Sequence, residues 1–261
     1  MRRRRKKTVN TTIEFDKSQL IDKRLIDKAS LWILRIILNL EGHREFIDKD
    51  DFVSKDTVLA FLDGNQFLDT DDGREEVMTF FSTNLLKLEK KKKFKTNKLL
   101  SKNIAQISSL IKLNKYEEQI LEFVTLLKQY ELLADAVSLL GSELNTTQTK
   151  RALSVILNIK RKEIDSAFAS DSKLSKSSLV TINKSNTNFL DRKLDSISDT
   201  FLDNLLNLDE DISVMIKDSI KVCSQSSLMQ KTEQIGHQCR LSSDTDAVSI
   251  RTVMPENIRT L

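Results

Sequence analysis

Residues 147–206 read TQTKRALSVILNIKRKEIDSAFASDSKLSKSSLVTINKSNTNFLDRKLDSISDTFLDNLL, and this stretch decides the predicted fold. A second helix, basic at its start, is predicted over residues 160–169, where Ile164 and Phe168 lie four positions apart. A short polar break separates it from a first helix, whose apolar face at helical spacing consists of Ala152, Leu153, Val155 and Ile156.

Two short runs of β-like composition follow these helices, at residues 179–182 and 189–194. A polar loop, residues 184–188, joins the two runs. The order helix, turn, helix, strand, loop, strand is typical of a winged helix. We therefore expect a mainly α-helical protein, in which helical material precedes a winged-helix-like unit with a small β wing.

The composition favours long helices and argues against several functional classes. Only one Pro and five Gly occur in 261 residues, and these residue types interrupt helices most often. The net charge is +4, and residues 2–7 alone supply six positive charges, so the rest of the chain is close to neutral. This balance gives weak support for nucleic-acid binding. Two Cys provide no disulfide framework, which favours a reducing compartment and predicts a cytoplasmic protein.

No membrane association is predicted. The best apolar run, residues 31–40, is interrupted by Arg35 and Asn39, and it is about half of the ~20 residues that a transmembrane helix needs. The basic N-terminus is followed by polar residues 8–17, where a signal peptide would be apolar.

Four regions are predicted along the chain. Residues 1–17 form a basic, disordered start, and residues 18–95 form an N-terminal helical block. Residues 96–223 form a helical domain that contains the winged-helix-like unit. The boundary is placed near residue 95 because the polar run over residues 90–98 has the composition of a linker. Residues 224–261 contain no Phe, Tyr or Trp and no sustained periodicity, so we expect a disordered or aberrant tail, with out-of-frame readthrough as one origin.

Capping residues mark several helix starts. Asn114, with Glu117 three positions later, has the pattern of a capping box. Asn145 and Ser198 are predicted caps of two further helices. The last predicted helix covers residues 209–222, and its apolar side contains Ile212, Met215, Ile216, Ser219 and Ile220.

The sequence contains no catalytic motif. It has neither the GxxxxGK[ST] phosphate loop nor GxGxxG. The Asp cluster at residues 69–72 resembles a calcium loop, but its twelfth position is Phe80, where an acidic ligand is needed. A zinc site at Cys223, His237 and Cys239 would lack a fourth ligand at normal spacing. We therefore expect no metal, and the missing motifs lead us to expect no enzyme activity and no cofactor.

DNA binding is the direct physical interpretation of the winged-helix-like unit. In a helix-turn-helix, the N-terminal residues of the second helix reach base edges in the major groove. Against this interpretation, Glu163, Asp165 and Asp171 lie among the basic residues. The candidate contacts with nucleic acid or a partner are Lys150, Arg151, Lys160, Arg161, Lys162, Lys173, Lys176 and Lys184.

Residues 113–208 also resemble the segment that precedes the ATPase module in a group of bacterial AAA+ proteins. In that group, a helix beginning Leu-x-x-x-Glu leads through a helical hairpin to the motif Asp-Ser-x-Leu-x-x-Ser-Gly-Leu-Val and then to a Leu/Ser-rich helix. This chain departs from the motif at Ser178, where Gly is usual, and the departure matters if that position needs a positive φ. The matching segments are residues 113–118 (LNKYEE), 171–180 (DSKLSKSSLV) and 198–206 (SDTFLDNLL).

The resemblance implies a nucleotide-binding module shortly after residue 222. The irregular tail takes that place, so none of the family's ATP-binding residues can be carried over. The chain is then expected to be the non-catalytic interaction or regulatory region of an AAA+ ATPase, truncated before its nucleotide-binding module, with a protein partner or ATPase subunits as its partners. Two alternatives stay open: a winged-helix DNA-binding transcriptional regulator, and a helical partner-binding protein.

Overall fold

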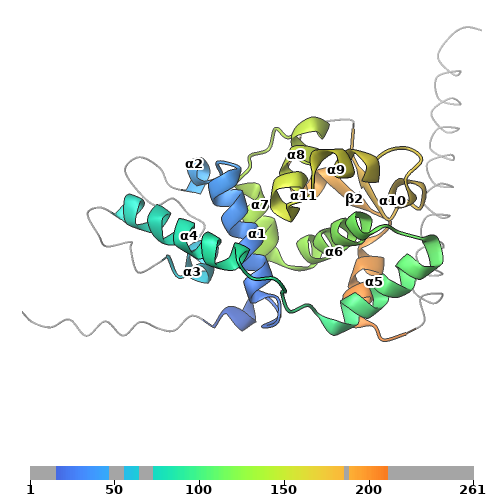
Figure 1. Cartoon of the computed structure of the whole chain (residues 1–261), viewed down its shortest axis with the longest axis horizontal. Helices are drawn as coiled ribbons and strands as arrows, with labels where there is room; N and C mark the ends of the chain where they lie inside the picture. Colours follow the sequence, from blue (N-terminus) through green and yellow to red (C-terminus); the bar gives the residue numbers. More distant parts are fainter. Residues whose placement is uncertain (1–15, 47–55, 65–72, 185–187, 211–261) are drawn as a thin grey trace, which may run out of the picture. The chain divides into compact units, whose positions relative to one another are not determined.

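The computed structural model describes residues 16–46, 56–64, 73–184 and 188–210 (Figure 1). The described part is mainly helical with one small two-stranded sheet, which confirms the predicted fold class. In chain order its elements are the 3₁₀ turn η1 (Lys17–Gln19), α1 (Ile26–Asn39), α2 (His43–Phe46), α3 (Asp56–Phe61), α4 (Gly73–Glu89), α5 (Lys98–Ile111), α6 (Lys115–Gln129), α7 (Glu131–Ser138), α8 (Thr146–Leu157), α9 (Arg161–Ala167), α10 (Lys173–Lys176), β1 (Val180–Ile182), α11 (Leu190–Lys193), β2 (Leu194–Ser196) and α12 (Asp199–Asn207).

Helix α1 contains a long run of buried residues in the N-terminal half. Its residues 31–37 read LWILRII, and all seven are buried. A helix that is apolar on all sides has to be covered on all sides. Accordingly, α1 packs against α4 and also against α7 and α8, which lie much later in the chain (Figure 1).

Helix α6 has a similar position in the C-terminal half, where it packs against α5, α7, α9 and α12. It begins with the predicted capping box. The Asn114 side chain accepts a hydrogen bond from the backbone N–H of Glu117 at 3.0 Å, and the Glu117 carboxylate accepts one from the N–H of Asn114 at 2.8 Å. The caps predicted at Asn145 and Ser198 are confirmed at the starts of α8 and α12.

An aromatic contact and an ion pair join α1 to α6. The rings of Trp32 and Phe123 meet edge to face, with centroids 5.1 Å apart. Next to them, Lys28 Nζ lies 2.5 Å from Glu122 Oε1 and 5.3 Å from the centroid of the Trp32 ring. Both charged side chains are largely shielded from water, so salt screens this ion pair less than one on the surface.

The buried Arg35 links α1 to both α4 and α8. Its Nη1 donates to the carbonyl oxygen of Ile156 at 2.9 Å, and its Nε donates to Glu89 Oε1 at 3.3 Å. Ile156 lies in the last turn of α8, where carbonyl groups lack donors within the helix and a cation is favourable. Arg35 therefore completes the end of a helix that is 121 residues away in the chain.

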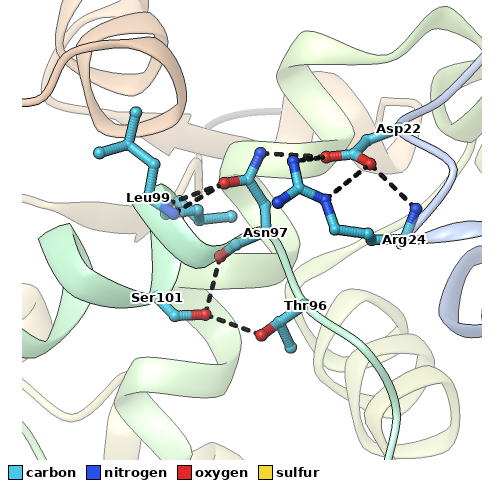
Figure 2. A network of polar contacts seen from close by, with 7 residues as sticks. Asp22, Arg24, Thr96, Asn97, Leu99 and Ser101 are labelled. Atoms are coloured by element: carbon cyan, nitrogen blue, oxygen red, sulfur yellow. Dashed lines mark hydrogen bonds and ion pairs between the residues drawn. The ribbon is translucent and has the colours of Figure 1, made fainter.

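The boundary predicted near residue 95 does not separate two cores. Buried apolar residues from both sides of it belong to one hydrophobic cluster. The polar run before α5 is itself anchored, because Asn97 accepts from the N–H of Leu99 at 2.9 Å and donates to Asp22 at 3.3 Å (Figure 2). Arg24 in turn pairs with Asp22 at 2.9 Å. The polar run over residues 90–98 is therefore joined by hydrogen bonds to the rest of the fold.

The second strand of the sheet begins later than predicted. Strands β1 and β2 are antiparallel, with Ile182 opposite Leu194 and Val180 opposite Ser196. Residues 189–194, predicted as a strand, are instead mostly the single helical turn α11. Leu190, Lys193 and Leu194 are all buried, at positions i, i+3 and i+4 of a helical face, whereas a strand would place the neighbours Lys193 and Leu194 on opposite faces.

Some predictions fall outside the described residues. These are most of the basic start (1–15), the Asp cluster at 69–72, and the middle of the loop at 184–188. The helix predicted over 209–222 is described only as far as residue 210, and the tail at 224–261 is not described. These therefore stay predictions.

Replacing Arg35 tests its role at the end of α8. We expect Arg35→Met to lower the free energy of unfolding by about 2 kcal/mol, because the Ile156 carbonyl loses its donor while buried. Urea denaturation followed by the fluorescence of Trp32 measures the change. The control is Arg44→Met, whose side chain is 70% exposed and which should change the free energy by less than about 0.5 kcal/mol. Equal losses in both variants would contradict the assignment.

Candidate interaction site

Two of the eight basic residues predicted as contacts are paired within the protein. Lys150 Nζ lies 3.0 Å from Asp165 Oδ1, and Arg161 Nε lies 3.2 Å from Asp165 Oδ2. Arg161 also donates to the carbonyl oxygen of Thr147 at 3.2 Å. Burial raises the pKa of Asp165, but hydrogen bonds and charge contacts with Lys150 and Arg161 outweigh this effect and hold the pKa below its ordinary value. Asp165 therefore neutralises part of the predicted basic surface and joins α8 to α9.

Of the remaining six predicted residues, two line different pockets. Arg151 lines a pocket of about 200 Å³ beside the end of α1, together with Glu41. Lys173 lines a different pocket, of about 300 Å³, beside Asn114 at the start of α6. All six are exposed and have no ion-pair partner in the described part of the chain: Arg151, Lys160, Lys162, Lys173, Lys176 and Lys184.

Two further lysines, which sequence analysis did not single out, support the sheet from inside. Lys193 is buried, and its Nζ donates to the carbonyl oxygen of Asn183. Lys128 on α6 donates to the carbonyl oxygen of Asp191 at 2.7 Å. Positive charge in this region therefore serves packing as well as facing solvent. No local pattern predicts either contact, because each depends on a partner from another element.

Glu117 connects the start of α6 to the segment over residues 171–180. Its Oε1 accepts from the backbone N–H of Leu174 at 3.2 Å, while its Oε2 accepts from Asn114. Glu117 and Leu174 are both buried. The capping pattern predicted the bond to Asn114. The bond to Leu174 spans 57 residues, so no local pattern could predict it.

Ser178 has a backbone conformation that favours glycine. Its φ is +55°, in the left-handed region, which costs a residue other than glycine roughly 1 kcal/mol. The two residues that follow, Leu179 and Val180, are both buried and lead into β1. The position at which this chain departs from the Asp-Ser-x-Leu motif therefore does have a positive φ.

A groove between α1, α3 and α4 was not found by sequence analysis. Its volume is about 330 Å³. No single stretch of sequence signals the groove, because its lining comes from elements that only the fold brings together. The apolar part of the lining consists of Ile26, Leu34, Phe61, Leu62 and Leu88.

Charged side chains surround this apolar lining. Lys17 pairs with Asp63 at 2.6 Å, and Lys91 pairs with Asp27 at 2.7 Å. Lys87 also lines the groove and has no ion-pair partner among the described residues. The groove therefore combines an apolar surface with one unpaired cation.

Among the described residues, no three or more His, Cys, Asp or Glu side chains are grouped so that they could hold a metal ion. Of the helices described, none is both long and apolar enough to cross a membrane.

Comparison with known proteins finds no matching protein family, no matching curated protein and no matching solved structure.

The backbone at Ser178 leads to a stability prediction. We expect Ser178→Gly to raise the melting temperature by roughly 1–4 °C, because relief of the left-handed strain exceeds the entropy that glycine adds to the unfolded chain. Thermal unfolding followed by circular dichroism measures the change. The matched control is Ser177→Gly, next in the chain, where φ is −81° and glycine should lower the melting temperature. A decrease in both variants would contradict the prediction.

Proposed function

We propose that this chain is a non-catalytic protein-interaction module, of the kind that precedes the ATPase module in bacterial AAA+ proteins, and that it acts in the cytoplasm. One observation carries the proposal: the groove between α1, α3 and α4 places an apolar surface beside the unpaired Lys87. The groove lies at the small end of the roughly 300–1,000 Å³ range of ligand pockets. It suits a protein segment that inserts one or two apolar side chains with a carboxylate next to them.

The segment over residues 171–180 supports the relation to AAA+ proteins. The similar motif has Gly at the position of Ser178, where φ is +55°. The Ser172 hydroxyl caps α10 by accepting a hydrogen bond from the N–H of Ser175 at 3.1 Å. The side chain of Leu174, in the same turn, is buried. The relation is tested by reading the DNA downstream of this coding sequence in all three frames. A GxxxxGK[ST] motif shortly downstream supports it, and a downstream region without one contradicts it.

The charge of Lys87 gives the binding test. The probes are two fluorescein-labelled helical peptides with the same leucine stripe, one flanked by Glu and the other by Lys. We expect the unmodified chain to bind the Glu-flanked peptide about fivefold more tightly, because one favourable charge contact contributes on the order of 1 kcal/mol. Lys87→Glu should reverse this order, as measured by fluorescence anisotropy.

The control for this experiment is Lys90→Glu. Lys90 is exposed near the end of the same helix but does not line the groove, so its variant should keep the original order. Equal affinity of the unmodified chain for both peptides would contradict the proposal. The same shift in Lys87→Glu and Lys90→Glu would show that net charge, and not the groove, decides binding.

DNA binding is the second candidate, and one observation favours it. Lys160 and Lys162 are exposed at the start of α9 and have no ion-pair partner among the described residues. In a helix-turn-helix, residues at the start of the second helix contact bases. Arg161, which lies between them, is instead bound to Asp165 and Thr147, so the basic start of α9 is only partly available.

A salt titration separates the two candidates. We expect a variant with residues 2–7 changed to Gln to bind duplex DNA with a Kd weaker than ~10⁻⁴ M at about 100 mM salt. Removal of the six N-terminal charges is needed because they can bind phosphate groups without any contribution from α9. Fluorescence anisotropy with a labelled duplex measures the Kd. Tight binding with a steep salt dependence, abolished by adding Lys160→Gln and Lys162→Gln, would favour the DNA-binding regulator.

A further inference from the structure

The chain between α4 and α5 carries a dense run of lysines. Residues 90–98 read KKKKFKTNK, and all six lysines of this run are exposed. Lys91 pairs with Asp27 at 2.7 Å. The four lysines that follow Lys91 have no ion-pair partner among the described residues. We call them the basic segment, and they are Lys92, Lys93, Lys95 and Lys98.

The backbone of the basic segment is held on the surface of the fold. At one end, Asn97 caps α5 and its side chain donates to Asp22 at 3.3 Å (Figure 2). At the other end is the ion pair of Lys91 with Asp27. Between these two anchors, Phe94 is partly buried and packs against the hydrophobic core. The backbone is therefore fixed, while the ammonium groups of the basic segment face solvent.

The four like charges lie close together along the chain. Lys92 and Lys98 are six positions apart, which corresponds to at most about 20 Å of extended backbone. The points at which the four side chains are attached are thus at most about 7 Å apart on average, which is less than the ~8 Å Debye length at physiological ionic strength. Salt screens their mutual repulsion only in part, so an anionic partner relieves it.

The basic segment begins at the rim of the groove between α1, α3 and α4. Lys91 lines the groove and directly precedes Lys92. Lys87, one helical turn before Lys91, lines the groove as well. The acidic residue between them, Glu89, is bound by the buried Arg35. A partner that fills the groove therefore has its neighbouring residues next to unpaired lysines.

We propose that the basic segment binds an acidic run that adjoins the apolar anchor of the same protein partner. Resting on the proposed function, this assignment adds the sequence character of the partner. The partner carries apolar side chains for the groove and, next to them, a run of about four Asp or Glu residues. Protein is favoured over nucleic acid as the occupant, because a sugar-phosphate chain carries no aliphatic side chain to fill the apolar part of the groove.

Fluorescence anisotropy with three labelled peptides tests the proposal. The first is the Glu-flanked peptide with the leucine stripe, and the other two carry four additional Glu residues at one end or at the other. The full chain is used with residues 2–7 changed to Gln, because those six charges also attract an acidic run. We expect the better of the two extended peptides to bind at least ~10-fold more tightly than the first at about 100 mM salt.

Removal of the four charges of the basic segment should abolish this gain. The test variant carries Lys92→Gln, Lys93→Gln, Lys95→Gln and Lys98→Gln, and it should bind the extended and unextended peptides equally. The matched control removes four other lysines that are exposed and without an ion-pair partner in the described part of the chain, so that its net charge is the same. These are Lys160→Gln, Lys162→Gln, Lys173→Gln and Lys176→Gln. The control should keep the gain, and circular dichroism checks that both variants are folded.

The outcomes separate the role of the basic segment from that of the groove. Binding of the unextended peptide without any gain from either extension overturns the acidic run and leaves the groove as the site. If none of the peptides binds, both proposals fail. An equal loss of the gain in the two variants assigns it to net charge, which also overturns the proposal. Tighter binding of a single-stranded oligonucleotide of the same charge, lost only in the test variant, would assign the basic segment to nucleic acid instead.

Discussion

The guanidinium of Arg35 is removed from water, and a buried charge is stable only when its polar atoms are paired. The guanidinium of Arg35 donates to acceptors on two helices. These are the Ile156 carbonyl at the end of α8 and the Glu89 carboxylate at the end of α4. The apolar surface of α1 requires neighbours on all sides, and Arg35 determines which helix ends meet there. Because the groove lies between α1, α3 and α4, its shape depends on the same contacts.

Local signals predicted the parts of the fold that are determined locally. Asn114, Asn145 and Ser198 were identified as caps because a side-chain acceptor and the N–H groups that it binds lie within three residues. The strand predicted over residues 189–194 was wrong because a short apolar run is ambiguous between helix and strand when only local signals are used. No break in the hydrophobic core accompanies the boundary predicted near residue 95. Contacts such as Lys28 with Glu122 cross it, and no local charge pattern reveals them.

The candidate site was less predictable than the fold. The sequence showed where basic residues are concentrated, but not which of them are paired with acidic residues. Lys150 and Asp165 are fifteen positions apart, and they meet only because α9 folds back on α8. The groove was invisible for the same reason, because Leu34, Phe61 and Leu88 come from three helices. Its apolar residues had ordinary core patterns in the sequence.

The carboxylate of Glu117 has a mechanical consequence. One group accepts hydrogen bonds from the start of α6 and from α10, so the two elements share a single acceptor. Movement of α10 away from α6 would leave a buried oxygen unpaired, at a cost of about 1–3 kcal/mol. The Glu117 carboxylate therefore couples the position of α10 to the start of α6. Helix α6 in turn contacts α1 through Phe123 and Trp32.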